Sequence, residues 1–143
     1  MENTLQQIDR LDLDGWQLLL DRSAEVFHDI KPGARVGVVS KDDFEPPTAT
    51  MLVWEATEQG MRASYEPFPG FERVAIDLLL IADDATIVRM HDSATSAPFA
   101  EIRSKLRRRD ILLYVVKPRD ALIEAGYENL LDSLGLAVLG ACR

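Results

Sequence analysis

The chain has one cysteine and two histidines among its 143 residues, and these shortages already exclude several kinds of site. Cys142 has no second cysteine to pair with, so no disulfide links distant parts of the fold, and a reducing compartment is favoured. His28-Asp29 and His91-Asp92 are the only histidine-carboxylate pairs, too few for the ligand sets of metal-dependent phosphohydrolases. No Gly-x-Ser-x-Gly sequence is present, and no evident base lies near Cys142, so a nucleophilic hydrolase is not indicated.

Long uncharged apolar runs are also missing. The longest candidate, residues 74–82, contains Asp77 and is far shorter than the ~20 residues of a membrane-spanning helix. The first residues, MENTLQQIDRLDLDG, have neither the basic region nor the apolar region of a signal peptide. We therefore expect a cytoplasmic protein with no membrane partner.

What the sequence does contain is typical of a globular protein. Hydrophobic residues make up 47% of the chain and charged residues 28%, which separates it from the polar, highly charged chains that stay disordered. A chain of this length buries roughly 68% of the surface of its unfolded form, so it needs no metal or cofactor to fold. We expect a single domain over residues 1–143 and no cofactor.

Hydrophobic spacing predicts an α+β fold. Asp14 and Gln17 have the spacing of a capping box before a helix with Trp16, Phe27 and Ile30 on one face, which Pro32-Gly33 ends. Two further helices are expected over residues 98–109 and 118–134, the second with a kink at Gly126. Strands are expected over residues 35–40, 48–56, 61–66, 71–82, 86–91, 111–116 and 136–139.

These elements predict a mixed, mostly antiparallel sheet formed by a meander and a hairpin, followed by a C-terminal αβαβ segment. Residues 111–116, ILLYVV, are apolar throughout, which is typical of a central strand covered on both faces. A parallel pair with residues 136–139 would complete the C-terminal βαβ unit. Whether residues 74–82 form a strand or a helix is not settled by periodicity alone; we expect a strand.

Charge is distributed unevenly along the chain. The net charge is −8, yet residues 103–119 carry seven basic side chains and one acidic side chain. A basic patch on an acidic protein is suited to an anionic ligand or an acidic partner, or it is a solvated helix end next to the negative pole of the helix dipole. A glycine-rich phosphate loop is missing, and few aromatics are interleaved to stack on bases. The candidate binding residues are Arg103, Lys105, Arg107, Arg108 and Arg109.

Asp77 is a second candidate, because a buried carboxylate needs a partner or a raised pKa. We expect it to lie at an edge or to pair with an arginine such as Arg89. The order of elements, with Ile76-Asp77-Leu78 and a second strand after an acidic turn, resembles restriction-endonuclease-type nucleases in outline. That resemblance implies a metal-binding Asp77, but Val88-Arg89-Met90 stands where the family has Glu-x-Lys, which implies an inactive relative that binds nucleic acid.

No complete catalytic constellation emerges from these patterns. The charge distribution favours a non-enzymatic accessory or regulatory domain that acts through protein contacts, as a homodimer or docked to a larger partner, with residues 103–119 as the recognition surface. The nuclease-like nucleic-acid-binding protein is the alternative. A small-ligand sensor with a pocket between the sheet and the helix of Trp16 also stays open.

Overall fold

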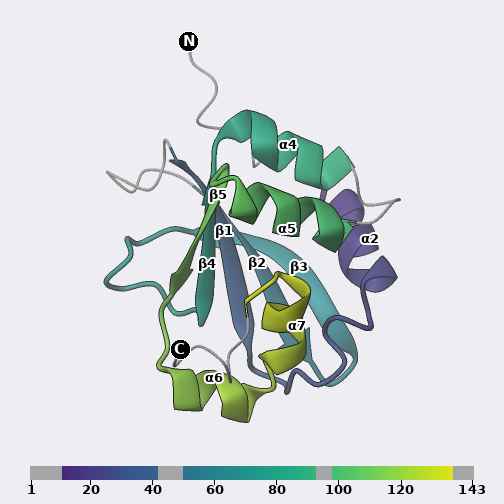
Figure 1. Ribbon diagram of the computed structural model, residues 1–143, viewed down its shortest axis with the longest axis vertical. Helices are drawn as coiled ribbons and strands as arrows, with labels where there is room; N and C mark the ends of the chain where they lie inside the picture. Colours follow the sequence, from purple (N-terminus) through teal and green to yellow (C-terminus); the bar gives the residue numbers. More distant parts are fainter. Residues whose placement is uncertain (1–10, 42–49, 93–97, 137–143) are drawn as a thin grey trace.

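The computed structural model describes residues 11–41, 50–92 and 98–136, in which helices pack on a five-stranded sheet (Figure 1). The predicted α+β class with a mixed, mostly antiparallel sheet is confirmed. In chain order the elements are α2 (Leu13–Arg22), β1 (Arg35–Ser40), β2 (Thr50–Thr57), β3 (Gly60–Pro67), β4 (Leu78–Ala82), α4 (Asp84–Asp92), α5 (Pro98–Arg107), β5 (Ile111–Val115), α6 (Arg119–Ala125) and α7 (Glu128–Ser133). No helix within these ranges has the length and apolar character needed to span a bilayer.

The strands lie in the order β3-β2-β1-β4-β5. Strands β1 and β4 are parallel, with Val36 opposite Leu78, and every other neighbouring pair is antiparallel. A parallel pair needs a long connection, and here it consists of β2, β3 and residues 68–77. The central strands β1 and β4 are covered on both faces, and their residues are almost all buried.

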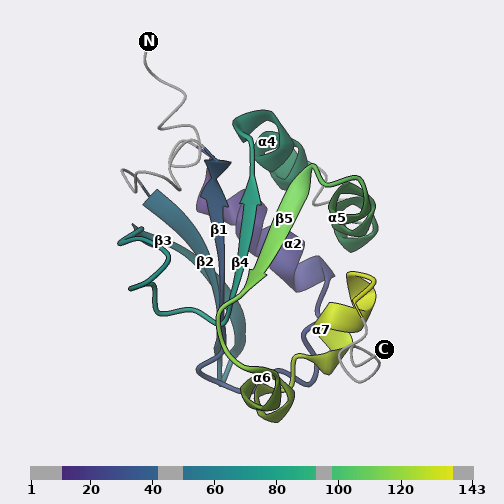
Figure 2. The same cartoon turned by 60° about the vertical axis from the view of Figure 1, so that its left-hand side comes forward.

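The two faces of the sheet are covered in different ways. Every described helix contributes to one core cluster with the sheet, which includes Trp16 from α2, Ile102 from α5 and Leu130 from α7 (Figure 2). On the opposite face, Phe68 and Ile76 from the connection between β3 and β4 pack against alternate residues of the strands. Helices therefore cover one face, and an irregular segment covers the other.

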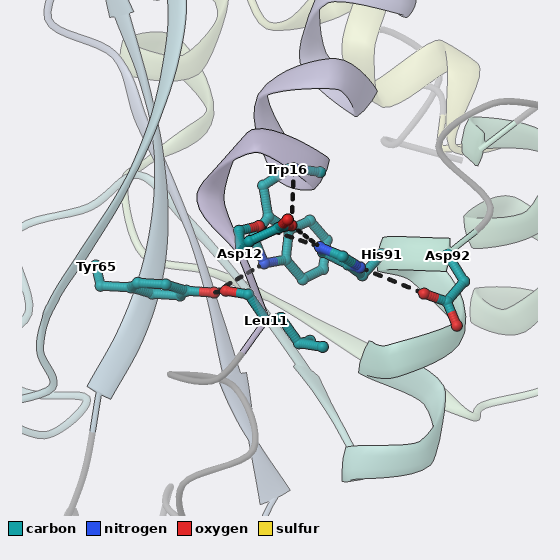
Figure 3. A network of polar contacts seen from close by, with 7 residues as sticks. Leu11, Asp12, Trp16, Tyr65, His91 and Asp92 are labelled. Atoms are coloured by element: carbon teal, nitrogen blue, oxygen red, sulfur yellow. Dashed lines mark hydrogen bonds and ion pairs between the residues drawn. The ribbon is translucent and has the colours of Figure 1, made fainter.

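A polar network ties α2 to β3 and α4 (Figure 3). The indole Nε1 of the fully buried Trp16 donates to the Tyr65 hydroxyl at 3.1 Å, which in turn donates to the Leu11 carbonyl oxygen at 2.5 Å. On the other side, Nε2 of His91 lies 2.9 Å from Oδ1 of Asp12. The His91 ring also meets the Trp16 ring edge-on at 5.1 Å between centroids. The start of α2 is thus fixed from both sides.

The first helix begins two residues earlier and ends earlier than the sequence indicates. Asp12, not Asp14, is the N-cap, and its side chain accepts from the Gly15 N–H. Gln17 binds across to β3 instead, since its amide donates to the Met61 carbonyl at 2.8 Å and accepts from the Ala63 N–H at 3.0 Å. After Arg22 the chain continues in tighter turns with i to i−3 hydrogen bonds.

The prediction of a strand over residues 86–91 is wrong, because these residues belong to α4. Asp83 begins the helix: its Oδ1 accepts from the Thr86 N–H at 2.9 Å. The buried residues of α4 are Thr86, Ile87 and Met90, which lie on one helical face. The apparent alternation therefore concealed a helical period in a short segment.

The strand over residues 111–116 was correctly located but wrongly expected to be central. Strand β5 (Ile111–Val115) pairs with β4 alone among the described strands, so it lies at the edge of the sheet. On the face that carries Ile111, Leu113 and Val115, exposure rises from 1% at Ile111 to 53% at Val115, and on the other face Leu112 and Tyr114 are 40% and 38% exposed. Tyr114 on the other face stacks edge-on against Phe71, with 5.4 Å between ring centroids. Strand β5 is therefore apolar on both faces although it is not fully buried.

Helices α6 and α7 replace the single kinked helix expected over residues 118–134. Gly126 ends α6 in the left-handed conformation, with φ of 88°. A Cβ at this position would lie 1.9 Å from the Asp29 carbonyl oxygen, so only glycine fits. The turn directs Tyr127, which is fully buried, into the core. The strand expected over residues 136–139 lies beyond the described residues, apart from Leu136, which is not in a strand.

Asp77 connects four parts of the fold. Its Oδ2 accepts from the Tyr127 hydroxyl at 2.7 Å and from the Arg35 N–H at 3.0 Å, and its Oδ1 lies 3.2 Å from Lys117 Nζ. The Asp77 carbonyl oxygen accepts from the Val116 N–H at 2.9 Å. One residue thus joins the start of β1, the start of β4, the end of β5 and the turn between α6 and α7. Burial, and then the Asp77 carboxylate, raise the pKa of Tyr127, which therefore stays a protonated donor.

Tyr127→Phe removes only the hydroxyl from this site. We expect the free energy of unfolding in urea to fall by about 1–3 kcal/mol, because Asp77 loses a donor where little water can replace it. Tyr114→Phe, in a ring that is 38% exposed, is the control and should change the free energy by less than about 0.5 kcal/mol. Equal effects of the two substitutions would contradict the anchoring role of Tyr127.

The Asp12 cap predicts a dependence of stability on pH. The Gly15 N–H, and after it the hydrogen bond from His91, hold the pKa of Asp12 below its ordinary value of 3.8. A lowered pKa in the folded state stabilises the fold above about pH 4, and this contribution is lost as the pH falls through the folded-state pKa. Asp12→Asn keeps a capping oxygen without the charge. The urea midpoint of the Asp12→Asn protein should fall less than that of the wild type between about pH 5 and pH 3. Equal decreases of the two midpoints over this range would refute the prediction.

Candidate functional site

A cavity of about 700 Å³ opens between the edge strand β5 and the helices α5, α6 and α7. In Figure 2, α5 and α7 lie on the same side of β5, and α6 lies beyond the end of the strand. On the strand face that carries Ile111, Leu113 and Val115, exposure rises from 1% at Ile111 to 53% at Val115. All three residues line the cavity.

Aliphatic side chains form most of the cavity wall. Val115 is 53% exposed and Leu136 is 39% exposed, so part of this wall faces solvent. Water against such a surface is unfavourable by about 25 cal/mol for each Å² that a ligand could cover. The aliphatic lining residues are Leu106, Ile111, Leu112, Leu113, Val115, Leu122, Leu131, Leu134 and Leu136.

Four arginines complete the lining. Arg103 and Arg107 belong to α5, Arg109 follows its end, and Arg119 begins α6. All four are exposed, and within residues 11–41, 50–92 and 98–136 none of them forms an ion pair with a carboxylate. The wall therefore combines an apolar surface with cations that are available to an anion.

The predicted basic patch is divided by this geometry. Arg103, Arg107 and Arg109 line the cavity, whereas Lys105 and Arg108 do not. Arg108 instead lies 3.8 Å from Asp110, measured from Nε to Oδ2. Arg119 and the aliphatic lining residues were not among the candidate binding residues, although several of them lie within residues 103–119. The available signal was the apolar run 111–116 with arginines on both sides of it.

Arg109 has an unusual backbone. It is the one residue other than glycine with a positive φ, 68°, among the described residues. Its N–H donates to Leu106 and the N–H of Asp110 donates to Lys105, which is the Schellman pattern that ends a helix. Glycine is the usual residue at this position, because other L-residues are strained there. In this chain an arginine beside the cavity occupies the position.

Asp77 does not form the metal site of a nuclease. It precedes β4 and pairs with Lys117 and Tyr127, not with Arg89 as expected. The segment that would be the second hairpin strand is the helix α4, and no group of three or more potential metal ligands occurs in the part of the chain that the structure describes. The nuclease-like alternative is therefore wrong at the level of both topology and site.

The histidines have other roles than metal binding. His28 is exposed, and its Nδ1 lies 3.1 Å from Oδ1 of the neighbouring Asp29. His91 is 15% exposed and lies between Asp12 and Asp92, where it holds the start of α2. Each histidine interacts with a local carboxylate.

A second hollow of about 870 Å³ lies between α2 and the β2–β3 hairpin, which is the place of the pocket that a small-ligand sensor would use. Its wall includes Asp14, Asp21 and Glu58, and Gln17 there already binds the β3 backbone. It is more polar and more acidic than the cavity beside β5.

The sequence matches no family model and no curated protein. Solved structures that are similar to it include three proteins. A ubiquinone synthesis protein, UbiJ-SCP2, is 14% identical over 89% of this chain and 84% of that chain, with a TM-score of 0.43. A conserved hypothetical protein from Thermus thermophilus is 16% identical over 96% and 91% of the two chains, and sterol carrier protein 2 is 15% identical over 90% and 99%; both have a TM-score of 0.44.

These comparisons correct the predicted function. A regulatory domain that acts through protein contacts was expected, with a nuclease-like protein as the alternative; the similar structures are instead described by sterol carrying and ubiquinone synthesis. The prediction of an accessory protein-contact domain is wrong. The prediction was based on the basic segment 103–119, and the sequence did not show that this segment borders an apolar cavity.

Arg109→Gly tests whether the backbone at the cavity is strained. We expect the free energy of unfolding to rise by about 1 kcal/mol, since glycine adopts a positive φ without steric cost. The matched control, Arg108→Gly, removes a residue whose N–H bonds back to Ser104 in the helical pattern, and should lower the free energy of unfolding. Urea denaturation measures both. A loss of stability in Arg109→Gly would show that the arginine side chain stabilises the free protein by more than the strain costs.

Proposed function

We propose that this protein binds a lipid-like ligand in the cavity between β5, α5, α6 and α7. The observation that carries the proposal is the solvent-facing aliphatic wall, in which Val115 and Leu136 are 53% and 39% exposed. Sites that bind small molecules in proteins are typically concave and lined mostly by apolar side chains. The volume of about 700 Å³ lies within the usual range of about 300–1,000 Å³ for such sites.

The cavity is suited to binding rather than to catalysis. The described residues that line it include no serine, cysteine, histidine, aspartate or glutamate. The wall thus offers neither a nucleophile nor a general base of ordinary basicity. A ligand that enters would gain from the burial of apolar surface and would leave chemically unchanged, as in a carrier.

Two of the similar solved structures have names that mention lipids, a sterol in one and ubiquinone in the other. Their TM-scores of 0.43 and 0.44 indicate a limited overlap of backbones. The proposal therefore rests on the cavity of this chain and its lining residues.

We also propose a single domain, a cytoplasmic location and self-association, as the sequence indicates. One domain over residues 1–143 is supported by the continuous sheet, and a cytoplasmic location by the lone Cys142. Self-association is supported by the outer edge of β5, which has no neighbouring strand among the described residues.

Binding of an uncharged fluorescent probe, N-phenyl-1-naphthylamine, tests the proposed function. The wild type should bind it with enhanced fluorescence. Val115→Glu should weaken binding by roughly tenfold, because an ionised carboxylate in the wall must be desolvated when the cavity fills. Val115 is half-exposed, so the fold should tolerate the change.

Leu18→Glu is the matched control for that experiment. Leu18 is an apolar residue of α2 that is 37% exposed and does not line the cavity, so its replacement should leave the affinity unchanged. Failure of the wild-type protein to bind the probe, or equal effects of the two substitutions, would overturn the lipid-binding proposal.

A further inference from the structure

The arginines at the cavity indicate the class of ligand. We propose that the cavity binds an amphiphile with an anionic headgroup, a carboxylate or phosphate on an apolar tail, with the tail against the aliphatic wall and the headgroup at Arg103, Arg107, Arg109 and Arg119. This inference rests on the proposed function and narrows it.

The charge of the lining supports an anion. All the titratable side chains of the described cavity lining are arginines, in a protein whose net charge is −8. An anionic headgroup would therefore meet attraction from the wall itself and no neighbouring carboxylate in the lining. A neutral ligand would use only the apolar part of the site, and a cation would be repelled.

The lining arginines come from separate elements. Arg103 and Arg107 are one helical turn apart on α5 and so lie on the same side of that helix, while Arg119 comes from the first residue of α6. Guanidinium groups donate two parallel hydrogen bonds to carboxylate or phosphate oxygens, which a lysine cannot do. The cavity lining contains arginines and no lysine, although Lys105 lies between two of them in the sequence.

Two local features keep arginines at the cavity. Arg109 occupies the left-handed position where a glycine would be less strained, and strain of this kind persists where a side chain has a function. Arg103 lies close over Gly135, where a Cβ would approach its Nε to 3.2 Å and its Cγ to 3.5 Å. The backbone at the end of α5 and the turn after α7 thus both accommodate an arginine side chain.

Displacement of N-phenyl-1-naphthylamine by ligands that share one tail tests this inference in the full chain. Dodecanoate and dodecyl phosphate carry an anion, whereas dodecanol carries none. We expect both anionic ligands to bind about tenfold more tightly than dodecanol at low salt, equivalent to ~1.4 kcal/mol. The difference should shrink as salt screens the exposed arginines. Acetate and inorganic phosphate, which lack the tail, should not displace the probe.

Variants separate the headgroup site from the rest of the basic segment. Arg107→Gln and Arg109→Gly should each weaken dodecanoate binding by about threefold to fivefold and weaken dodecanol binding by a smaller factor, because the alcohol has no charge for the guanidinium to meet. Arg108→Gln, next to both positions but outside the lining, should change neither. Reduced dodecanoate affinity in an Arg109→Gly protein that is more stable than the wild type could not be attributed to damage of the fold.

The outcomes distinguish the two proposals. If dodecanol binds as tightly as dodecanoate, the headgroup inference is overturned while lipid binding stands. If inorganic phosphate binds as tightly as dodecyl phosphate, the arginines form a site for a free anion and the inference is overturned as well. If the wild type binds neither the probe nor any of the dodecyl ligands, both proposals fail.

Discussion

The carboxylate of Asp77 is the interaction on which the rest of this fold depends. It accepts hydrogen bonds from the Arg35 backbone and the Tyr127 hydroxyl and pairs with Lys117, so the sheet and the C-terminal helices meet at one residue. A carboxylate that is only 9% exposed is stable there because each of its oxygens has a donor. Tyr127 lies between α6 and α7, and both helices line the cavity. The buried polar anchor thus positions the apolar site.

Edge strand β5 shows why an apolar sequence need not be central. One face carries Ile111, Leu113 and Val115 towards the helices and the cavity, and Tyr114 on the other face packs on Phe71. Continuous hydrophobicity normally indicates coverage by protein on both sides. Here part of that coverage is missing among the described residues, on the side where four arginines line the cavity.

Local signals in the sequence predicted the elements with strong periodicity and missed the features that depend on tertiary contact. The bounds of β1 were predicted correctly, since a β-branched run lies between a glycine turn and a charged loop. The helical period of α4 was concealed by its short length, and the break at Gly126 is decided by the carbonyl of Asp29, which is far away along the chain. The basic segment 103–119 contains all four lining arginines, and three of them were candidate binding residues, but only folding shows which cations of the segment face the cavity.

The two helices that hold the C-terminal side of the cavity are short: α6 has seven residues and α7 has six. Helices of this length have little stability of their own and depend on their tertiary contacts. The sheet, by contrast, is held by continuous ladders through β1 and β4. Local unfolding of α6 and α7 therefore costs less free energy than unfolding of the sheet. The sheet is thus the more rigid half of the molecule, and the cavity lies beside the half with the lower local stability.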